Sequence, residues 1–192
     1  LISALSEIGI PFGLRTLNVI LPVGISFYTF QSMSYALDVY RRELKPTRDL
    51  IHFLAYVSFF PQLVAGPIER ATHLLPQFSR TLTITGPMVA EGVWLCLWGM
   101  FKKVVIADNL APLVEMVYGN PQASGPMVVL ATLAFGIQIY GDFAGYSDIA
   151  IGLARMMGFR LPRNFRRPYL AANPREFWRR WHITFSTTIR DY

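Results

Sequence analysis

The sequence is poor in cysteine and in charged residues. Its one cysteine, Cys96, excludes an internal disulfide and says nothing about the redox compartment. We interpret it as a small apolar residue rather than a reactive thiol. Asp, Glu, Lys and Arg make up 16% of the 192 residues, whereas soluble domains carry about a quarter. This scarcity of charge argues against an ordinary soluble domain.

The sequence also lacks the short motifs that hold metals, nucleotides or an activated serine. His52, His73 and His182 have no metal-ligand spacing, and neither paired cysteines nor a His-Glu-x-x-His motif occurs. A Walker motif, a dinucleotide glycine fingerprint and a nucleophile elbow are missing too. We therefore predict no metal site and no bound cofactor.

Long uncharged stretches are the main feature that is present. No Asp, Glu, Lys or Arg occurs among the 22 residues 16–37, the 19 residues 50–68 and the 26 residues 116–141. A helix needs about 20 mostly apolar residues to cross a bilayer. A soluble core of this size has room for one such helix but hardly for three. The sequence therefore predicts an all-α, polytopic transmembrane helical bundle in a lipid bilayer.

The charges that do occur lie at the ends of the apolar stretches. The net charge of +6 therefore indicates positively charged cytoplasmic loops rather than nucleic-acid binding. Residues 41–48 and 160–180 are predicted to be cytoplasmic, and the turn-rich residues 119–126, which have no basic side chain, to be extracytoplasmic. Predicted helices cover residues 17–40, 49–64, 85–103 and 127–157, with a half-helix or interfacial segment at 104–118.

Two local signals refine this scheme. Asp49 is the predicted N-cap of the second span, and Pro61 with Gly66-Pro67 breaks its far end, which is typical of a re-entrant segment. The chain opens without an initiator Met and a basic region, and Tyr192 closes a helical pattern that has no stop signal. We expect residues 1–192 to be a single fragment of a longer domain, truncated at both ends.

The helix predicted at residues 127–157 carries polar side chains on one face. Gln138, Asp142 and Tyr146 follow one another at a spacing of four residues, and Asp148 lies nearby. Ionisable groups at membrane depth are costly and usually face a bundle interior or a wet cavity. Two readings are possible. Either these polar side chains line or brace a functional cavity, or Asp142 or Asp148 merely pairs with Arg155 or caps a neighbouring helix. The residues alone leave both readings open.

A second polar segment begins at Asn173, where Pro174 follows as the first helical residue and Glu176 completes a capping box. A helix running on from Pro174 would place Trp178, His182, Ser186 and Ile189 on one stripe. Such a histidine is a hydrogen-bonded structural residue, or it is a general base for a hydroxyl acceptor that burial keeps unprotonated near neutral pH.

Four segments together resemble a known family. They are residues 21–31, 59–68, 142–148 and 164–192, the last with Phe-Trp-Arg-Arg-Trp-His at 177–182 and Arg-Asp-Tyr at 190–192. Their order and spacing resemble the bacterial membrane-bound O-acyltransferases, closest to the alginate O-acetyltransferase membrane subunits. The sequence departs from the usual pattern at Thr184-Phe185, where Ser-Leu is common, and at Thr188, where Trp is common.

The resemblance implies transfer of an acyl group, with acetyl preferred, onto hydroxyls of an exported cell-envelope polysaccharide such as alginate. It implies a multi-pass protein of the bacterial inner membrane, a donor such as acetyl-CoA or another acyl thioester, and periplasmic acetyltransferase partner subunits. His182 corresponds to the family's catalytic histidine, and a second family histidine is expected beyond residue 192. The residues predicted to line the substrate cavity are Asp142, Tyr146, Asp148, Trp178, Trp181, Ser186, Arg190 and Asp191.

Three alternatives remain open at this point. A transporter or export channel would also place Asp and Arg in broken helices, but would show pseudo-symmetric halves, and no internal repeat is visible. A non-catalytic relay subunit of an acetylation complex would carry the same motif. Within the family, D-alanyl transfer to teichoic acid is the third possibility.

Overall fold

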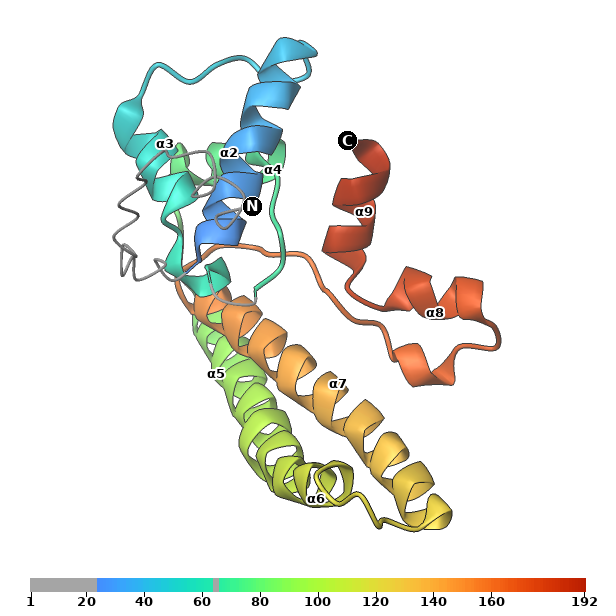
Figure 1. The fold of residues 1–192 in the computed structure, drawn as a ribbon. Coiled ribbons are helices and arrows are strands. Elements are labelled where there is room, and N and C mark those ends of the chain that lie inside the picture. Colours follow the sequence, from blue (N-terminus) through green and yellow to red (C-terminus); the bar gives the residue numbers. More distant parts are fainter. Residues whose placement is uncertain (1–23, 64–65) are drawn as a thin grey trace, which may run out of the picture.

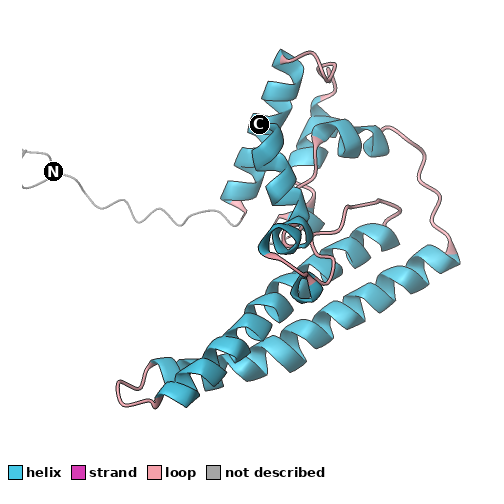
Figure 2. Ribbon diagram, turned by 90° about the vertical axis from the view of Figure 1, so that its right-hand side faces the viewer, coloured by secondary structure: helices cyan, strands magenta, loops and turns pink. Residues whose placement is uncertain are grey.

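The computed structural model describes residues 24–63 and 66–192, and the regular structure within these ranges is helical throughout (Figure 2). This confirms the predicted all-α class, whereas residues 17–23 and 64 of the predicted spans lie outside the described residues. The elements in chain order are α2 Ile25–Tyr40, α3 Leu50–Val57, η1 Phe60–Gln62, α4 Ala71–Phe78, α5 Gly86–Met100, η2 Phe101–Ala107, α6 Asp108–Tyr118, α7 Gly125–Met156, η3 Pro168–Leu170, α8 Pro174–Arg180 and α9 Ile183–Asp191.

A long hairpin forms one half of the structure, with α5, η2 and α6 running along α7 (Figure 1). The helix predicted at residues 127–157 is confirmed as α7, which has 32 residues. Within the described part of the chain, α7 is the one helix long and apolar enough to cross a membrane, and Leu50–Gln62 is a shorter apolar stretch. By length and composition, the described residues therefore hold one candidate membrane span.

Glycines allow the two arms of the hairpin to approach closely. A Cβ placed on Gly145 would lie 2.7 Å from the carbonyl oxygen of Gly99, and one placed on Gly99 would lie 2.5 Å from that of Gly145. Neither position can therefore hold a larger residue without separating the helices. Gly145 is thus a small residue at a close helix contact, where membrane helices commonly use glycine.

The predicted end of a span at Lys102-Lys103 is wrong. The helix continues through η2, which is a π-helix, into α6. The widened turn leaves carbonyl groups to satisfy, and the Asn109 amide donates hydrogen bonds of 3.0 and 2.9 Å to the carbonyl oxygens of Val104 and Val105. Both lysines reach carboxylates on α7.

The second predicted span is also not one continuous helix. Its N-cap is confirmed, since the Asp49 carboxylate accepts hydrogen bonds from the backbone of Ile51 and His52. The helix α3 then stops at Val57, and Phe59 is extended before the short turn that contains Pro61. Proline lacks the N–H that would donate to the carbonyl four residues earlier, and for Pro61 that residue is Val57, the last of α3, so the chain bends here as the position of Pro61 predicts.

The second half of the structure is a compact cluster of α2, α3 and α4 at one end of the hairpin (Figure 1). Its core joins three parts of the chain through Phe59, Phe78 and Phe159, whose ring centroids lie 4.8 to 5.6 Å apart. Tyr56 and Leu74 are fully buried beside them. This core anchors the end of α7 and the beginning of the arginine-rich segment that follows it.

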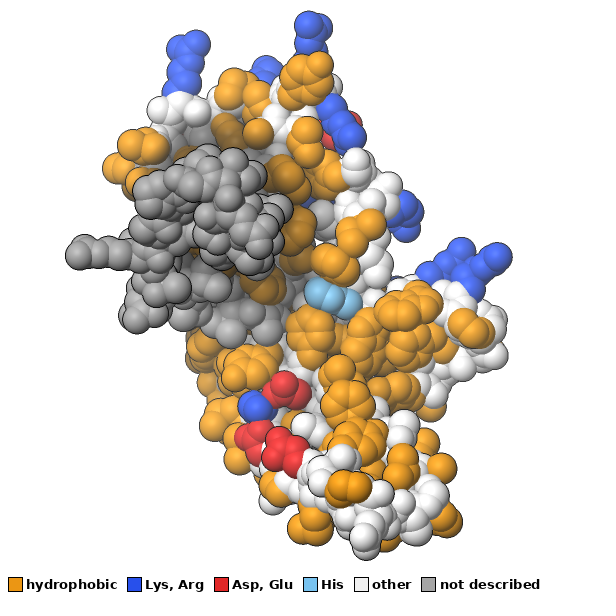
Figure 3. Space-filling model, in the orientation of Figure 1, with side chains coloured by type: hydrophobic (Ala, Val, Ile, Leu, Met, Phe, Trp, Pro, Cys, Tyr) orange, Lys and Arg blue, Asp and Glu red, His pale blue; other side chains and the backbone are white. Residues whose placement is uncertain are grey.

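On the face seen in Figure 3, hydrophobic side chains cover much of the hairpin, while Lys and Arg side chains lie mainly at the opposite end of the molecule, over α2 and α3, and near α8. Trp94, Leu97, Leu130 and Leu133 each expose more than half of their surface. Such a broad apolar surface is typical of a segment that faces lipid or protein rather than water.

Candidate active site

The helix predicted from Pro174 onward is confirmed only in its first turns. The Asn173 side chain accepts a hydrogen bond from the backbone of Glu176 at 2.9 Å, so the predicted N-cap is confirmed. The Glu176 carboxylate accepts a hydrogen bond from the backbone of Ala172, one residue before the N-cap, and not from Asn173 as a full capping box requires. The helix α8 ends at Arg180, and His182 adopts a left-handed backbone with φ of 40°. The predicted continuous stripe is therefore wrong, because the chain turns at His182 and restarts as α9 (Figure 1).

The imidazole of His182 lies between two aromatic rings. It meets Phe143 of α7 edge-on, with 4.6 Å between ring centroids, and stacks on Phe185 of α9 at 5.0 Å. Its Nε2 atom is shielded from solvent and has no hydrogen-bond partner among the described residues. Burial lowers the pKa of His182 to about 4, because the apolar surroundings disfavour the charged ring. The imidazole is therefore neutral at physiological pH.

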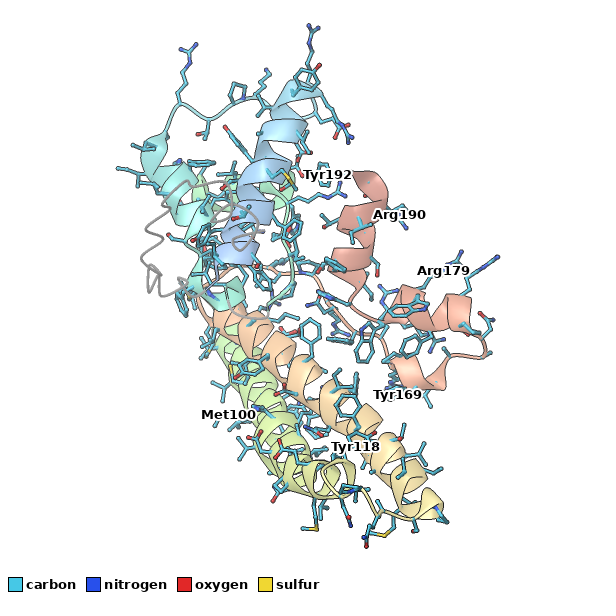
Figure 4. The ribbon with its side chains drawn as sticks, in the orientation of Figure 1. Met100, Tyr118, Tyr169, Arg179, Arg190 and Tyr192 are labelled. Carbon is cyan, nitrogen blue, oxygen red and sulfur yellow. The ribbon has the colours of Figure 1, made fainter. Side chains whose placement is uncertain are left out.

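The far end of α9 is fixed by ionic contacts. The Asp191 carboxylate pairs with Arg70 and, at 3.1 Å, with Arg190. The Tyr192 hydroxyl donates a hydrogen bond of 2.5 Å to Asp38, and Tyr192 lies between α9 and α2 in Figure 4. Asp191 therefore ties the end of α9 to Arg70, which lies in a distant part of the sequence. Arg190 is largely exposed at the same end.

Trp181 and Trp178 have different surroundings although both belong to the same motif. Trp181 packs in an aromatic cluster, with centroid distances of 5.1 Å to Phe165 and 5.5 Å to Phe177. Trp178 is 60% exposed and touches Phe177 edge-on. Ser186 lies one turn into α9, where its backbone N–H donates to the His182 carbonyl at 3.0 Å.

Asp142 and Asp148 of α7 pair with different lysines of η2. Asp142 pairs with Lys103 at 2.8 Å, and the Lys103 ammonium also binds Asp108 and lies 5.8 Å from the centre of the Tyr146 ring. Asp148 pairs with Lys102 at 2.5 Å in a less exposed position. The alternative that either aspartate pairs with Arg155 is wrong, because Arg155 pairs with Glu91.

A groove of about 1470 Å³ runs along α7 on the Asp148 side, and we call it the cationic groove. Its lining includes Lys102, seven arginines and three acidic residues. Each acid is already paired, Asp148 with Lys102, Glu91 with Arg155 and Glu176 with Arg180. The surplus positive charge comes from Arg160, Arg163, Arg166, Arg167 and Arg179.

His182 does not line the cationic groove but lies behind its wall. Phe165 and Asn164 line the groove, and the Phe165 ring lies 5.1 Å from Phe143, the ring that His182 meets. Reasoning from the sequence missed Asn164, Lys102 and Lys103 as site residues. Two adjacent lysines inside an apolar helix were the available signal for the latter pair, since buried ammonium groups need carboxylate partners.

The described residues hold no group of three or more His, Cys, Asp or Glu side chains placed to bind a metal ion. What the geometry offers is a neutral imidazole in an apolar wall, with a polyanion-attracting groove on one side. The polar cluster of Lys103, Asp108 and Asp142 lies farther along the same hairpin. A neutral imidazole can accept a proton from a hydroxyl, and a groove with surplus positive charge attracts anionic groups.

Comparison with known families agrees with this arrangement. The sequence model of the membrane-bound O-acyltransferase family matches residues 41–192, and the chain therefore belongs to that family. The resemblance that the motifs suggested is confirmed, and so is the assignment to a class of membrane proteins.

Three named relatives show which members of this family the chain resembles. The chain is 46% identical over 194 residues to a protein of Pseudomonas aeruginosa named "Probable alginate O-acetylase AlgI", covering 100% of this chain and 37% of that protein. It is 38% identical to the "Peptidoglycan O-acetyltransferase" of Helicobacter pylori, covering 93% of this chain and 39% of the relative. It is 28% identical to the "Teichoic acid D-alanyltransferase" of Bacillus subtilis, covering 91% and 45%. The chain thus spans less than half the length of these relatives.

Proposed function

We propose that the full-length protein is an O-acyltransferase of the bacterial inner membrane that moves an acyl group, in the first place acetyl, onto hydroxyls of an exported polysaccharide such as alginate. Family membership and the names of the relatives support the activity and the kind of acceptor. The apolar hairpin surface supports the membrane setting, and several passes are part of the proposal. Periplasmic acetyltransferase subunits are the proposed partners.

The observation that carries the proposal is the state of His182. A general base must be unprotonated and must have a free ring nitrogen to receive the proton. Burial keeps the imidazole neutral, and its Nε2 has no partner among the residues described. A structural histidine would normally engage a buried ring nitrogen in a hydrogen bond.

The proposed reaction uses His182 as general base and then as general acid. For this step the acceptor hydroxyl has to enter the apolar pocket at Nε2, which is shielded from solvent in the structure. There Nε2 takes the proton of the acceptor hydroxyl while the hydroxyl oxygen attacks the carbonyl carbon of the acyl thioester. The carbon–sulfur bond then breaks, and the leaving thiolate takes the proton from the imidazolium. A new ester and a free thiol result, and the neutral imidazole is restored.

The cationic groove is the proposed approach for the donor. Acyl thioesters of coenzyme A carry several phosphate charges, and arginine binds phosphate in a bidentate way. Five groove arginines have no acidic partner in the groove, so they are available for such a ligand. Within the groove, Asp148 neutralises Lys102 and so lowers the net positive charge of the lining.

The proposed acceptor side is the face of the hairpin that carries Asp142 and Tyr146. The Asp142 side chain is 45% exposed despite its ion pair with Lys103, so it can still accept hydrogen bonds from sugar hydroxyls. Trp178 and Ser186 stay as predicted substrate contacts. Trp181 is proposed to shape the wall beside His182, and Arg190 with Asp191 to hold α9.

The test is acetyl transfer by the purified full-length protein in lipid nanodiscs, with acetyl-CoA and an oligosaccharide acceptor. His182→Ala should lower kcat by a factor of about 10² to 10⁴, the usual contribution of a general base. His52→Ala is the matched control and should retain activity, because this histidine lies on α3 with its side chain 35% exposed and pairs with Asp49.

The outcomes also separate the alternatives. Normal transfer by His182→Ala would overturn the catalytic role. Donor turnover that appears only when periplasmic subunits are added would favour a relay subunit. Polysaccharide flux that survives loss of His182 would favour a transporter.

A further inference from the structure

A buried hydrogen-bond node lies directly beside His182, and Asn164 is its centre. Asn164 is 1% exposed and belongs to the segment that leaves α7. Its amide nitrogen donates to the Ser147 hydroxyl at 3.0 Å, and its amide oxygen accepts from the Thr184 hydroxyl at 2.6 Å. Its backbone carbonyl accepts from the Ile183 N–H at 2.9 Å. One residue therefore ties α7 to the first turn of α9.

The node continues into a third part of the chain. The Thr184 hydroxyl also accepts a hydrogen bond of 3.0 Å from the backbone N–H of Ile68. Thr184 thus uses its single proton toward Asn164 and a lone pair toward Ile68, which leaves its side chain one orientation. Thr184 and Ser147 are buried like Asn164, so each bond is shielded from competing water.

The two helices joined by Asn164 are those that enclose the imidazole of His182. Phe143 lies one helical turn before Ser147 on α7, and Phe185 directly follows Thr184 on α9. These two phenylalanines form the walls on either side of the ring. The two side-chain hydrogen bonds of Asn164, to Ser147 and Thr184, therefore set the distance between Phe143 and Phe185.

The backbone at His182 needs the same support. A φ of 40° is rare for a residue other than glycine, and such a conformation persists only where the surroundings impose it. The turn is held before His182 by the Trp181 N–H to Phe177 carbonyl bond and after it by the Ile183 N–H to Asn164 carbonyl bond, both of 2.9 Å. Of these two, only the second reaches a residue outside α8 and α9.

We propose that Asn164 is a positioning residue that fixes the orientation of His182, acting through Thr184 and the backbone of Ile183. The inference rests on the proposed catalytic role of His182. An asparagine suits this place because it supplies a donor and an acceptor at once without a charge, which a buried site would penalise.

The experiment compares variants of the full-length protein in nanodiscs. Thr184→Val removes the hydroxyl and keeps the shape of the side chain, Thr184→Ser keeps the hydroxyl, and Asn164→Ala removes the amide. Thr132→Val and Asn120→Ala are matched controls, because both residues are exposed and remote in sequence from His182. We expect Thr184→Val and Asn164→Ala to lower kcat on the order of 100-fold with little change in KM, since a catalytic group displaced by about 1 Å costs that much. Thr184→Ser should recover activity.

A second readout reports on the imidazole itself, independent of turnover. Diethylpyrocarbonate modifies accessible, unprotonated imidazole, and peptide mass spectrometry resolves each histidine. Because Nε2 of His182 is shielded, its modification should be slow in the parent and faster in Thr184→Val and Asn164→Ala. His73, whose side chain is 58% exposed, is the internal reference and should react equally in all variants.

The results distinguish this inference from the proposed function. If His182→Ala stays active, the proposed function fails. If His182→Ala is inactive while Thr184→Val keeps its kcat and its slow modification of His182, the positioning role fails. If Asn164 acts by positioning His182, adding Asn164→Ala to His182→Ala causes no further loss of kcat. Should Asn164→Ala not fold, the Thr184→Val and Thr184→Ser pair decides the matter alone.

Discussion

Tyr192 donates a hydrogen bond of 2.5 Å to the Asp38 carboxylate, although the two residues are 154 positions apart in the sequence. Asp38 is 1% exposed on α2, and the guanidinium groups of Arg41 and Arg70 lie 5.4 and 5.2 Å from the centre of the Tyr192 ring. The contact joins the end of α9 to α2, and so it fixes the helix that follows His182.

This contact predicts a stability effect. Tyr192→Phe leaves a buried carboxylate oxygen without its donor, which should lower the free energy of unfolding by about 1–3 kcal/mol. Tyr118→Phe is the control, because that exposed hydroxyl bonds only to Thr132 among the described residues, and a cost within about 0.5 kcal/mol is expected. Melting temperatures of the purified full-length variants measure both. Adding Asp38→Asn should restore part of the loss, and equal costs for the two tyrosines would contradict the assignment.

The pH dependence of transfer follows from the environment of His182. Burial holds the pKa of the imidazole at about 4, so the base form dominates throughout the neutral range. We expect kcat/KM to be level from about pH 8 to pH 6 and to fall only as the pH approaches 4, because protonation removes the lone pair that accepts the proton. Initial rates with acetyl-CoA across this range test it. An acid limb centred near 6.5, the pKa of a solvated histidine, would show that the ring is hydrated in the working enzyme.

Replacing Asp148 by asparagine should destabilise the protein more than replacing Asp142 by asparagine. Asp148→Asn leaves Lys102, which is 14% exposed, without its partner, and the expected cost is about 2 kcal/mol. Asp142→Asn leaves Lys103 paired with Asp108, so the expected loss is below about 1 kcal/mol. Thermal unfolding of both variants makes the comparison. A larger loss for Asp142→Asn would mean that the pairing of the two lysines is assigned wrongly.

Glu69 predicts a pH-dependent stability. Burial raises the pKa of its carboxyl to about 7, and the group contacts His73 beside Arg70. Between the unfolded value of 4.5 and about 7 the folded protein therefore binds more protons than the unfolded one, so this contribution to stability is lost as the pH rises. Glu69→Gln does not titrate. The melting temperature of Glu69→Gln relative to that of the parent should increase from pH 5 to pH 7 and level off above pH 7. Expressed as free energy of unfolding, the full change is at most about 3 kcal/mol. An offset that does not change with pH would contradict the raised pKa.

Local patterns in the sequence were sufficient for the elements whose causes are local. The extent of α7 follows from a long apolar run, and the starts of α3 and α8 follow from the side chains of Asp49 and Asn173, which bond to N–H groups two or three residues away. Membership of the family was also readable, because motif order and spacing are properties of the sequence itself. His182 was named for the same reason.

The tertiary structure alone decided how these elements form a site. Lys102 and Lys103 pair with Asp148 and Asp142 of α7, which are distant in sequence, and the helix continues past the two lysines as a π-helix. The left-handed turn at His182 opposes the local helical pattern and is held by Asn164, which is distant in sequence. Helix periods and caps are short-range effects and can be read from neighbouring residues. The neutral state of His182, the cationic groove and the node at Asn164 depend on which distant side chains exclude water together, and only the folded chain brings them together.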